Sequence, residues 1–295
     1  MVERSVAVIG AGAIGAPVAA ALAAESPHRL SVCVRRPIGA LEIHRRDGSV
    51  LRTSSRIVTD PADVGPVDVV LLATKTYQST GAGPWLTALC RPGTVVAVLQ
   101  NGIDQVERIG PLAPAAHVVP VVVLLAAEAV APGVVECHGE ALLEVPDDEH
   151  GRVVASLFDG TGVRVSPVAD FRTRAWRKLL MNAVVGSVGA LTLRDLSVLA
   201  EPAIEPVALA LAEEIVAVGR AEGAAIDVDL ARRAIAAARK GAPAHASSIT
   251  VDRREGRPLE WEARNAVIGR LGRHHGIPTP LNDLVTALLA ACDPR

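Results

Sequence analysis

The stretch Val6-Ala7-Val8-Ile9-Gly10-Ala11-Gly12-Ala13-Ile14-Gly15 decides the fold. Its first four residues are an apolar, β-branched run, typical of a buried parallel strand. Glycines with G-x-G-x-x-G spacing follow at once, an Ala-rich helical pattern continues to about Glu25, and residues 30–34 predict the next strand. A strand–helix–strand unit of about thirty residues is the context in which these glycines indicate a dinucleotide-binding turn. An ordinary glycine-rich turn is the alternative.

Each glycine has its own expected role. Gly10 makes the tight turn, Gly12 lets the backbone approach a pyrophosphate, and Gly15 allows close packing of helix on strand. The start of the helix then offers N–H groups and positive dipole to the phosphates. The predicted cofactor-binding loop is therefore Gly10, Ala11, Gly12, Ala13, Ile14 and Gly15.

The end of the second predicted strand indicates which dinucleotide binds. It reads Val34-Arg35-Arg36, where a site for NAD would carry Asp or Glu to hold the ribose 2′-hydroxyl. A basic residue suits the 2′-phosphate instead, so Arg35 predicts NADP(H). Solvated surface arginines are the alternative.

Composition excludes several classes of protein. Half of the 295 residues are apolar and 21% are charged, enough for a real core and unlike a disordered chain. Thirty basic against thirty-two acidic residues give a net charge of −2, which argues against a partner such as nucleic acid or an anionic membrane. This length predicts one large domain or two medium ones.

Neither disulfides nor a metal site is expected. Cys33, Cys90, Cys137 and Cys292 are scattered, and the eight histidines form no H-E-x-x-H motif. The uncharged run of residues 5–24 resembles a signal peptide or membrane span, but its glycines and Pro17 fit a strand, turn and helix better. We therefore expect a cytoplasmic protein with reduced thiols.

The pattern changes near residue 170. Before it, strands are predicted at 67–73, 95–99, 118–125, 134–137, 141–145 and 163–165, with 134–137 and 141–145 as a hairpin. After it come helical patterns at 171–191, 201–222, 228–240 and 258–275. The predicted fold is α/β, with a Rossmann-type doubly wound domain (1–167) followed by an all-helical substrate domain (168–295). The substrate is expected between the two.

The second half contains a candidate proton donor. Lys178, Asn182 and Gly186 are four apart and share one helix face in an apolar stretch. A partly desolvated lysine has a lowered pKa, which suits a proton donor to a developing alkoxide. A surface lysine beside a helical asparagine is the alternative. Glu260, taken by itself, is expected in a helix's first turn, where acidic residues are usually structural.

Six motifs read in order resemble the ketopantoate reductase (2-dehydropantoate 2-reductase) family. They are Gly10-x-Gly12-x-x-Gly15, Lys75-Thr-Tyr-Gln78, Gln100-Asn101-Gly102, Trp176-x-Lys178-Leu-x-x-Asn182-Ala183, Ser247-Ser248-x-x-x-Asp252 and Glu260-Trp-Glu262-Ala-Arg-Asn265. The stretch from His275 to Asn282 resembles the family's closing motif, so the likeness runs from about residue 5 to 290.

The resemblance implies that NADPH donates hydride to the 2-keto carbon of a 2-keto acid, ketopantoate to pantoate by default, a step of pantothenate biosynthesis. It implies Lys178 as general acid and Glu260 as the group that engages the substrate hydroxyl and supports Lys178. Asn101 would lie between nicotinamide and substrate and Lys75 beside the cofactor. Asn182 and Ser248 would hold the substrate.

Two positions depart from the family pattern. The family usually places a second asparagine where this chain has Gly186, and often an asparagine where it has His245. Both belong to the substrate-holding set, so His245 is a candidate carboxylate partner or a plain loop residue, and the substrate stays open. A homodimer is possible from the apolar helices of the second half.

Two other functions compete with this one. A β-hydroxy acid dehydrogenase or imine reductase also joins a Rossmann domain to helices and uses Lys and Asn four apart, but it lacks the Glu260 and Ser248 motifs. A non-catalytic NADP(H)-binding sensor is the second alternative.

Overall fold

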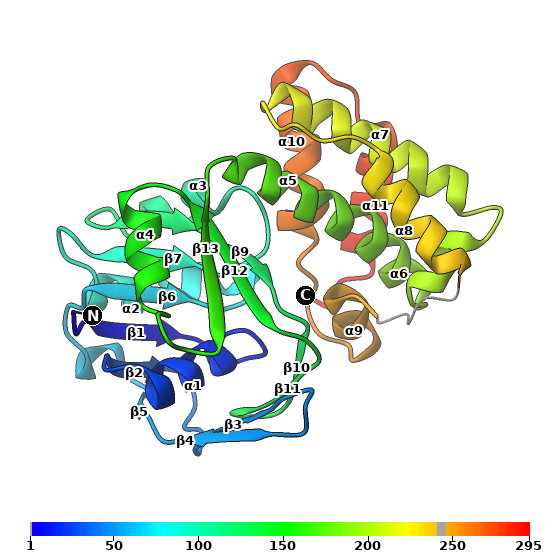
Figure 1. The fold of residues 1–295 in the computed structure, drawn as a ribbon. Helices are drawn as coiled ribbons and strands as arrows, with labels where there is room; N and C mark the ends of the chain where they lie inside the picture. The colour runs from blue at the N-terminus through cyan, green and yellow to red at the C-terminus, as the bar shows by residue number, and fades with distance from the viewer. Residues whose placement is uncertain (1, 241–245) are drawn as a thin grey trace. The chain divides into compact units, whose positions relative to one another are not determined.

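The computed structural model describes residues 2–240 and 246–295 (Figure 1). The chain divides into two compact units. Unit 1 comprises Met1–Gln100 and Asp104–Phe171, and unit 2 comprises Asn101–Ile103 and Arg172–Arg295. The chain thus leaves unit 1 once for three residues and returns, before leaving it for good after Phe171. Each unit is described by itself below.

Unit 1 is built on a six-stranded parallel sheet. Its strand order is β5-β2-β1-β6-β7-β8, so the chain adds strands outward from β1 on one side and then from β6 on the other. The order therefore reverses between β1 and β6, and open α/β sheets bind ligands at such a switch point. The strands are β1 Ser5–Ile9, β2 Arg29–Cys33, β5 Arg56–Val58, β6 Val69–Leu72, β7 Val95–Val98 and β8 His117–Pro120.

Helices cover both faces of this sheet, because side chains alternate along each buried strand. Val6 and Val8 share a core with α1 (Gly15–Glu25) and α4 (Glu149–Ser156). Ala7 and Ile9 face the other way, into a core that contains Trp85, Leu86 and Leu89 of α2 (Gly83–Leu89) and Ile109 of α3 (Gln105–Ile109). Unit 1 is therefore the doubly wound domain that the sequence predicts.

Two smaller sheets complete unit 1 and correct two sequence-based predictions. One has the order β10-β11-β3-β4 and the other β13-β12-β9. The predicted hairpin is wrong: β11 pairs with β10 and β3, whereas β12 pairs with β13 and β9. The predicted strand 118–125 is divided between two sheets as β8 and β9. The strands are β3 Leu41–His44, β4 Val50–Thr53, β9 Val122–Leu124, β10 Ala127–Ala131, β11 Val134–Cys137, β12 Ala141–Pro146 and β13 Val163–Val168.

Unit 2 is helical around one apolar core. Its α-helices are α5 Phe171–Met181, α6 Ser187–Thr192, α7 Glu205–Ala221, α8 Asp229–Arg239, α9 Ser248–Arg254, α10 Val267–His275 and α11 Pro280–Ala291. Two π-helical turns, Asn182–Gly186 and Glu262–Ala266, join α5 to α6 and lead into α10. The predicted helix at 258–275 starts only at Trp261, so Glu260 lies just before it rather than in its first turn. None of the described helices is long and apolar enough to cross a membrane.

Gly15 provides a test of the packing at the start of α1. A Cβ on Gly15 would lie 1.9 Å from the Gly10 carbonyl oxygen and 3.0 Å from Ala73 Cβ, whereas a Cβ on Gly12 would meet nothing within 4 Å. We expect Gly15→Ala to lower the free energy of unfolding by about 2–3 kcal/mol, the cost of overpacking. Gly12→Ala, the matched control, should cost less than about 1 kcal/mol. Urea denaturation without ligand measures both, and equal losses would contradict the packing role.

Candidate functional site

The loop between β1 and α1 has the geometry expected of a dinucleotide-binding turn. Gly10 has φ +96°, a conformation that favours glycine, and its N–H donates to the Cys33 carbonyl at 2.9 Å. Gly15 packs against Gly10, as described above. A Cβ on Gly12 would meet no atom within 4 Å, so the backbone at this position is open to close approach. The expected roles of Gly10 and Gly15 thus match the geometry.

The surroundings of this loop suit a phosphate. No side chain among the described residues caps the N-terminus of α1, and its first turn holds no acidic group. An uncapped helix start with its positive dipole favours an anion. Arg35 is exposed just beyond β2, two residues after Cys33, whose carbonyl bonds to the glycine loop. Arg35 therefore lies just after the end of β2 that is hydrogen-bonded to the glycine loop.

Polar residues at the carboxyl ends of β6 and β7 bond to one another. Gln100 is 3% exposed, and its Nε2 donates to Thr74 Oγ1 at 3.0 Å. Gln100 Oε1 also accepts from Ser79 Oγ at 3.1 Å. The Lys75 N–H donates to Gln78 Oε1 at 3.3 Å. The Lys75-Thr-Tyr-Gln78 and Gln100-Asn101 motifs thus meet at the strand ends, where ligands bind in such sheets.

The second cluster lies in unit 2, where the two π-turns contact each other through polar side chains. A π-turn changes the register of helical hydrogen bonds and occurs frequently at functional sites. Asn265 is fully buried: its Oδ1 accepts from Ser187 Oγ at 2.8 Å, and its Nδ2 donates to the Ala183 carbonyl at 3.4 Å. Asn282 Nδ2 donates in turn to the Asn265 carbonyl at 3.0 Å. These bonds satisfy carbonyls in both π-turns.

Three predicted site residues lie together beside these turns. Asn101 Nδ2 donates to Glu260 Oε2 at 2.9 Å, although 159 positions separate the two residues. Asn182 Nδ2 donates to Asn101 Oδ1 at a longer 3.4 Å. Glu260 is 3% exposed, so its carboxylate is held by this amide in a buried position. The sequence motifs around residues 101, 182 and 260 therefore form one constellation.

Lys178 has the lowered pKa that its sequence context predicts. The pKa of Lys178 is lowered to about 8: burial is the largest cause, the neighbouring Arg264 guanidinium also lowers it, and Glu260 opposes both by raising it. A group with a pKa near neutral exchanges protons readily at physiological pH, which is what a general acid or base requires. Lys178 and Glu260 thus interact electrostatically within one site.

Arg264 also belongs to this site, although the sequence reasoning missed it. The side chain is 1% exposed, and its Nη2 donates to Ser248 Oγ at 2.9 Å and lies 3.9 Å from Glu260 Oε2. Burial lowers the pKa of Arg264, opposed by Glu260 and Asp252, and a guanidinium remains charged in any case. No sequence pattern marks it, because an arginine on a helix is usually solvated.

Gly186 makes room for this guanidinium. A Cβ at Gly186 would lie 3.0 Å from Arg264 Nη1 and 3.2 Å from Ile249 Cγ2. The departure from the family pattern at residue 186 therefore coincides with a charged side chain packed against that position. The other departure, His245, lies outside the described residues, and its role stays a prediction.

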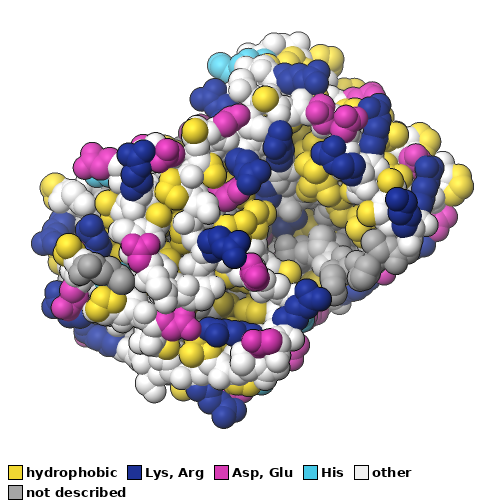
Figure 2. All heavy atoms as spheres, in the orientation of Figure 1, with side chains coloured by type: hydrophobic (Ala, Val, Ile, Leu, Met, Phe, Trp, Pro, Cys, Tyr) yellow, Lys and Arg dark blue, Asp and Glu magenta, His cyan; other side chains and the backbone are white. Residues whose placement is uncertain are grey.

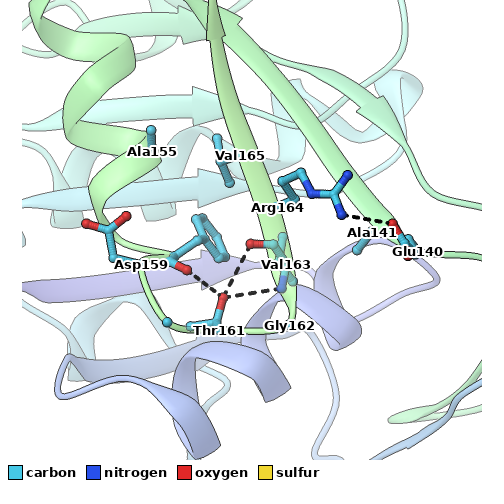
Figure 3. A pocket seen from close by; sticks show the side chains of 11 residues that line it. Glu140, Ala141, Ala155, Asp159, Thr161, Gly162, Val163, Arg164 and Val165 are labelled. Carbon is cyan, nitrogen blue, oxygen red and sulfur yellow. Dashed lines mark hydrogen bonds and ion pairs between the residues drawn. The ribbon is translucent and has the colours of Figure 1, made fainter.

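Two cavities of unit 1 do not contain these residues. One, of about 420 Å³, is lined by Asp159–Val165 and neighbouring residues, where Arg164 pairs with Glu140 at 3.2 Å (Figure 3). Another, of about 580 Å³, lies beside Pro17 and Ala21 of α1. Neither is lined by a residue that the sequence analysis assigned to the cofactor or the substrate. We attach no function to them.

The cysteines and the possible metal-ligating side chains form no further site among the described residues. All four cysteines are free thiols, and burial raises the pKa of Cys33 to about 12 and of Cys90 to about 11, which disfavours the reactive thiolate. Among the described residues, His, Cys, Asp and Glu form no group of three suited to a metal ion. Acidic and basic side chains are interspersed on the face shown in Figure 2.

Family models match almost the whole chain. The model described as "Ketopantoate reductase PanE/ApbA" matches residues 6–149, and "Ketopantoate reductase PanE/ApbA C terminal" matches residues 170–293. The chain belongs to the ketopantoate reductase family. The resemblance expected from the sequence motifs is thereby confirmed, together with the fold class.

Individual relatives agree with this assignment. A 2-dehydropantoate 2-reductase of Caulobacter vibrioides is 42% identical over 287 residues, covering 97% of this chain and 98% of that one. One from Mycobacterium tuberculosis is 40% identical over 289 residues, covering 97% of each. Among solved structures, a dimeric ketopantoate reductase from Staphylococcus aureus superposes with a TM-score of 0.86 at 26% identity over 98% of both chains.

The buried amide of Asn265 provides a second test. Asn265→Leu keeps the volume but leaves Ser187 Oγ, the Ala183 carbonyl and Asn282 without their partner. We expect the free energy of unfolding to fall by about 2–4 kcal/mol, because each unsatisfied buried group costs about 1–3 kcal/mol. Asn182→Ala, which removes one long bond from a partly exposed side chain, should cost less than about 1 kcal/mol. Chemical denaturation of both variants measures the difference, and a loss no larger for Asn265→Leu would show that the π-turns do not need the amide.

Proposed function

We propose that this chain reduces ketopantoate to pantoate with NADPH, with Lys178 as the general acid. As a member of the ketopantoate reductase family it is an oxidoreductase that acts on a 2-keto acid and its 2-hydroxy product. The observation that carries the residue assignment is the Asn101–Glu260 hydrogen bond beside a lysine whose pKa is near 8. The motifs around Asn101, Lys178, Ser248 and Glu260, which the resemblance assigns to one site, lie in that environment.

The residues of unit 1 fit a dinucleotide. The open position at Gly12 and the uncapped N-terminus of α1 suit a pyrophosphate, which would be held by the loop Gly10–Gly15. Lys75, at the end of β6, is proposed to lie beside the cofactor. When bound, the nicotinamide supplies the hydride that reduces the keto carbon.

The part of Lys178 follows from its environment. Negative charge develops on the carbonyl oxygen as the keto carbon is reduced, and the Lys178 ammonium stabilises that charge and donates its proton to the oxygen. The lysine leaves the reaction neutral and regains a proton from solvent. A pKa near 8 keeps most of the side chain protonated at neutral pH while making the proton easier to transfer than from an ordinary lysine.

The neighbouring polar groups position the acid and the substrate. Glu260 offsets part of the positive charge near Lys178, and Asn101 fixes the direction of the Glu260 carboxylate through its 2.9 Å bond. Glu260 is proposed to accept a hydrogen bond from the substrate hydroxyl. Asn182 and Ser248 are proposed to hold the substrate, with His245 as a further candidate.

NADPH rather than NADH is the proposed cofactor. Arg35 stands after β2 where an acidic residue would hold the ribose 2′-hydroxyl of NAD, and its exposed guanidinium is suited to a phosphate. Structural relatives under 25% identity include a D-mandelate dehydrogenase with NADH, and that likeness bears on the fold alone. The choice between the dinucleotides therefore depends on Arg35.

The competing functions are not favoured. Models of the ketopantoate reductase family match both parts of the chain, and the relatives at 40–42% identity are named 2-dehydropantoate 2-reductase. A homodimer stays a prediction for this chain. The description of the Staphylococcus aureus relative as dimeric supports it. Cytoplasmic location also stays a prediction.

The pH profile tests the general acid. Because the protonated form of Lys178 acts in reduction, kcat/KM for ketopantoate should be level near neutral pH and fall as pH rises through about 8. For pantoate oxidation the neutral lysine acts, so the same group should make the rate rise with pH. Lys178→Met should lower kcat by about 10²–10⁴. Lys240→Met, at an exposed lysine, is the matched control. A Lys178→Met enzyme as fast as wild type would refute the assignment.

Exchanging the cofactor tests Arg35. We expect Arg35→Ala to lower the ratio of kcat/KM for NADPH to that for NADH by about tenfold or more, since a charge-assisted phosphate contact is lost. The control is Arg29→Ala, at the opposite end of β2, where Arg29 pairs with Glu3 at 3.1 Å. Initial rates with both dinucleotides give the ratio. An unchanged ratio in Arg35→Ala would mean that other residues select the cofactor.

A further inference from the structure

We propose that Arg264 binds the carboxylate of the substrate, and so determines that this enzyme takes a 2-keto acid in its anionic form. The inference rests on the proposed reduction with Lys178 as acid. It assigns a substrate-binding role to a residue outside the motifs that led to that proposal.

The first support is the hydrogen bonding of the guanidinium. Arg264 Nη2 donates to Ser248 Oγ, whereas Nε and Nη1 are buried and find no hydrogen-bond partner among residues 2–240 and 246–295. A buried donor without an acceptor costs about 1–3 kcal/mol, and more when it is charged. The guanidinium therefore has unused donors in a place where leaving them unused is costly. Nε and Nη1 point to different sides of the guanidinium, so a carboxylate would accept from one of them and from the second N–H of Nη2 as a parallel pair.

The second support is the balance of charge. Lys178 and Arg264 interact with each other and with the carboxylate of Glu260. The buried Asp252 carboxylate also interacts with Arg264, but its Oδ1 accepts a hydrogen bond from Arg257 Nε at 2.8 Å, so two guanidinium groups share its charge. Among the described residues, the half-buried Lys178 and the buried Arg264 thus share the Glu260 carboxylate. One further negative charge would balance them, and the substrate carboxylate supplies it.

The third support is the room made for the guanidinium. Gly186 has no side chain, and a Cβ there would press on Arg264 Nη1 at 3.0 Å. Glycine in a π-turn is unfavourable for the backbone, so its presence needs a reason in the packing. Here it admits a charged side chain beside the proton donor. Gly186 and Arg264 therefore act together, because the missing side chain of one makes room for the guanidinium of the other.

The same contacts connect Arg264 to residues already proposed to hold the substrate. Ser248 Oγ receives the Nη2 hydrogen bond, which leaves that hydroxyl free to donate to a ligand oxygen. Glu260 Oε2, 3.9 Å from the same nitrogen, is the group proposed for the substrate hydroxyl. Carboxylate and hydroxyl ends of one small molecule would thus meet neighbouring side chains.

Binding of acid and amide distinguishes this role from a structural one. The probes are pantoate and pantoamide, its uncharged carboxamide, titrated calorimetrically into enzyme saturated with NADP⁺. We expect wild type to prefer pantoate by about 10- to 150-fold, the range for charge-assisted hydrogen bonds. Arg264→Met should lose that preference by weakening pantoate binding alone. Arg264→Lys, which keeps the charge without the fork, should lie between the two. Arg270→Met, at an exposed arginine of the same helix, is the control.

The outcomes separate the two proposals. Equal binding of acid and amide by wild type, an unchanged preference in Arg264→Met, or an equal loss for both probes would each overturn the role of Arg264. Should Arg264→Met fail to fold, the wild-type preference and Arg264→Lys decide. A wild-type enzyme that turns over no ketopantoate would refute the proposed function itself, whereas full turnover with an unchanged preference in the variants would refute only the present inference.

Discussion

The buried amide of Asn265 is the polar group that joins the two π-turns of the helical unit, through bonds to Ser187 Oγ and the Ala183 carbonyl. A buried carbonyl without a donor is costly, and the two π-turns create such carbonyls in the middle of helices. Asn265 and Asn282 satisfy them with side-chain amides. The interrupted helices can therefore pass each other closely, and the residues that precede and follow the turns are brought to one place.

That arrangement sets the electrostatics of the site. Lys178, Arg264 and Glu260 lie close together within it, and the arginine and the carboxylate both change the pKa of the lysine. Burial alone would lower the pKa of Lys178, and the arginine adds to the effect while Glu260 limits it. With a pKa of about 8, Lys178 is neither permanently charged nor permanently neutral near physiological pH. This balance depends on exclusion of water as much as on the charges.

The sequence predicted those parts of the fold that are determined by interactions between residues close together in the chain. The strand, glycine turn and helix at residues 5–25 have fixed spacing, and the buried strands after them read as apolar runs. The pairing of β11 and β12 was not predictable in the same way, because strand partners depend on residues far away in the chain. Arg264 escaped notice for a related reason: an arginine on a helix is usually solvated, and only its contact with Gly186 in three dimensions shows its burial. The π-turns likewise leave no mark in the helical periodicity.

The division of the chain has a consequence for how such enzymes diverge. Asn101–Ile103 belongs to the helical unit, although residues on both sides of it belong to the other. A single peptide bond joins Gln100, bonded to Thr74, to Asn101, bonded to Glu260. Neither unit is therefore a continuous piece of the gene that could be exchanged intact between relatives. A recombination with one breakpoint near residue 171 would therefore place Glu260 in a chain whose residue 101 comes from the other parent, and would preserve their hydrogen bond only if that parent also has a donor there.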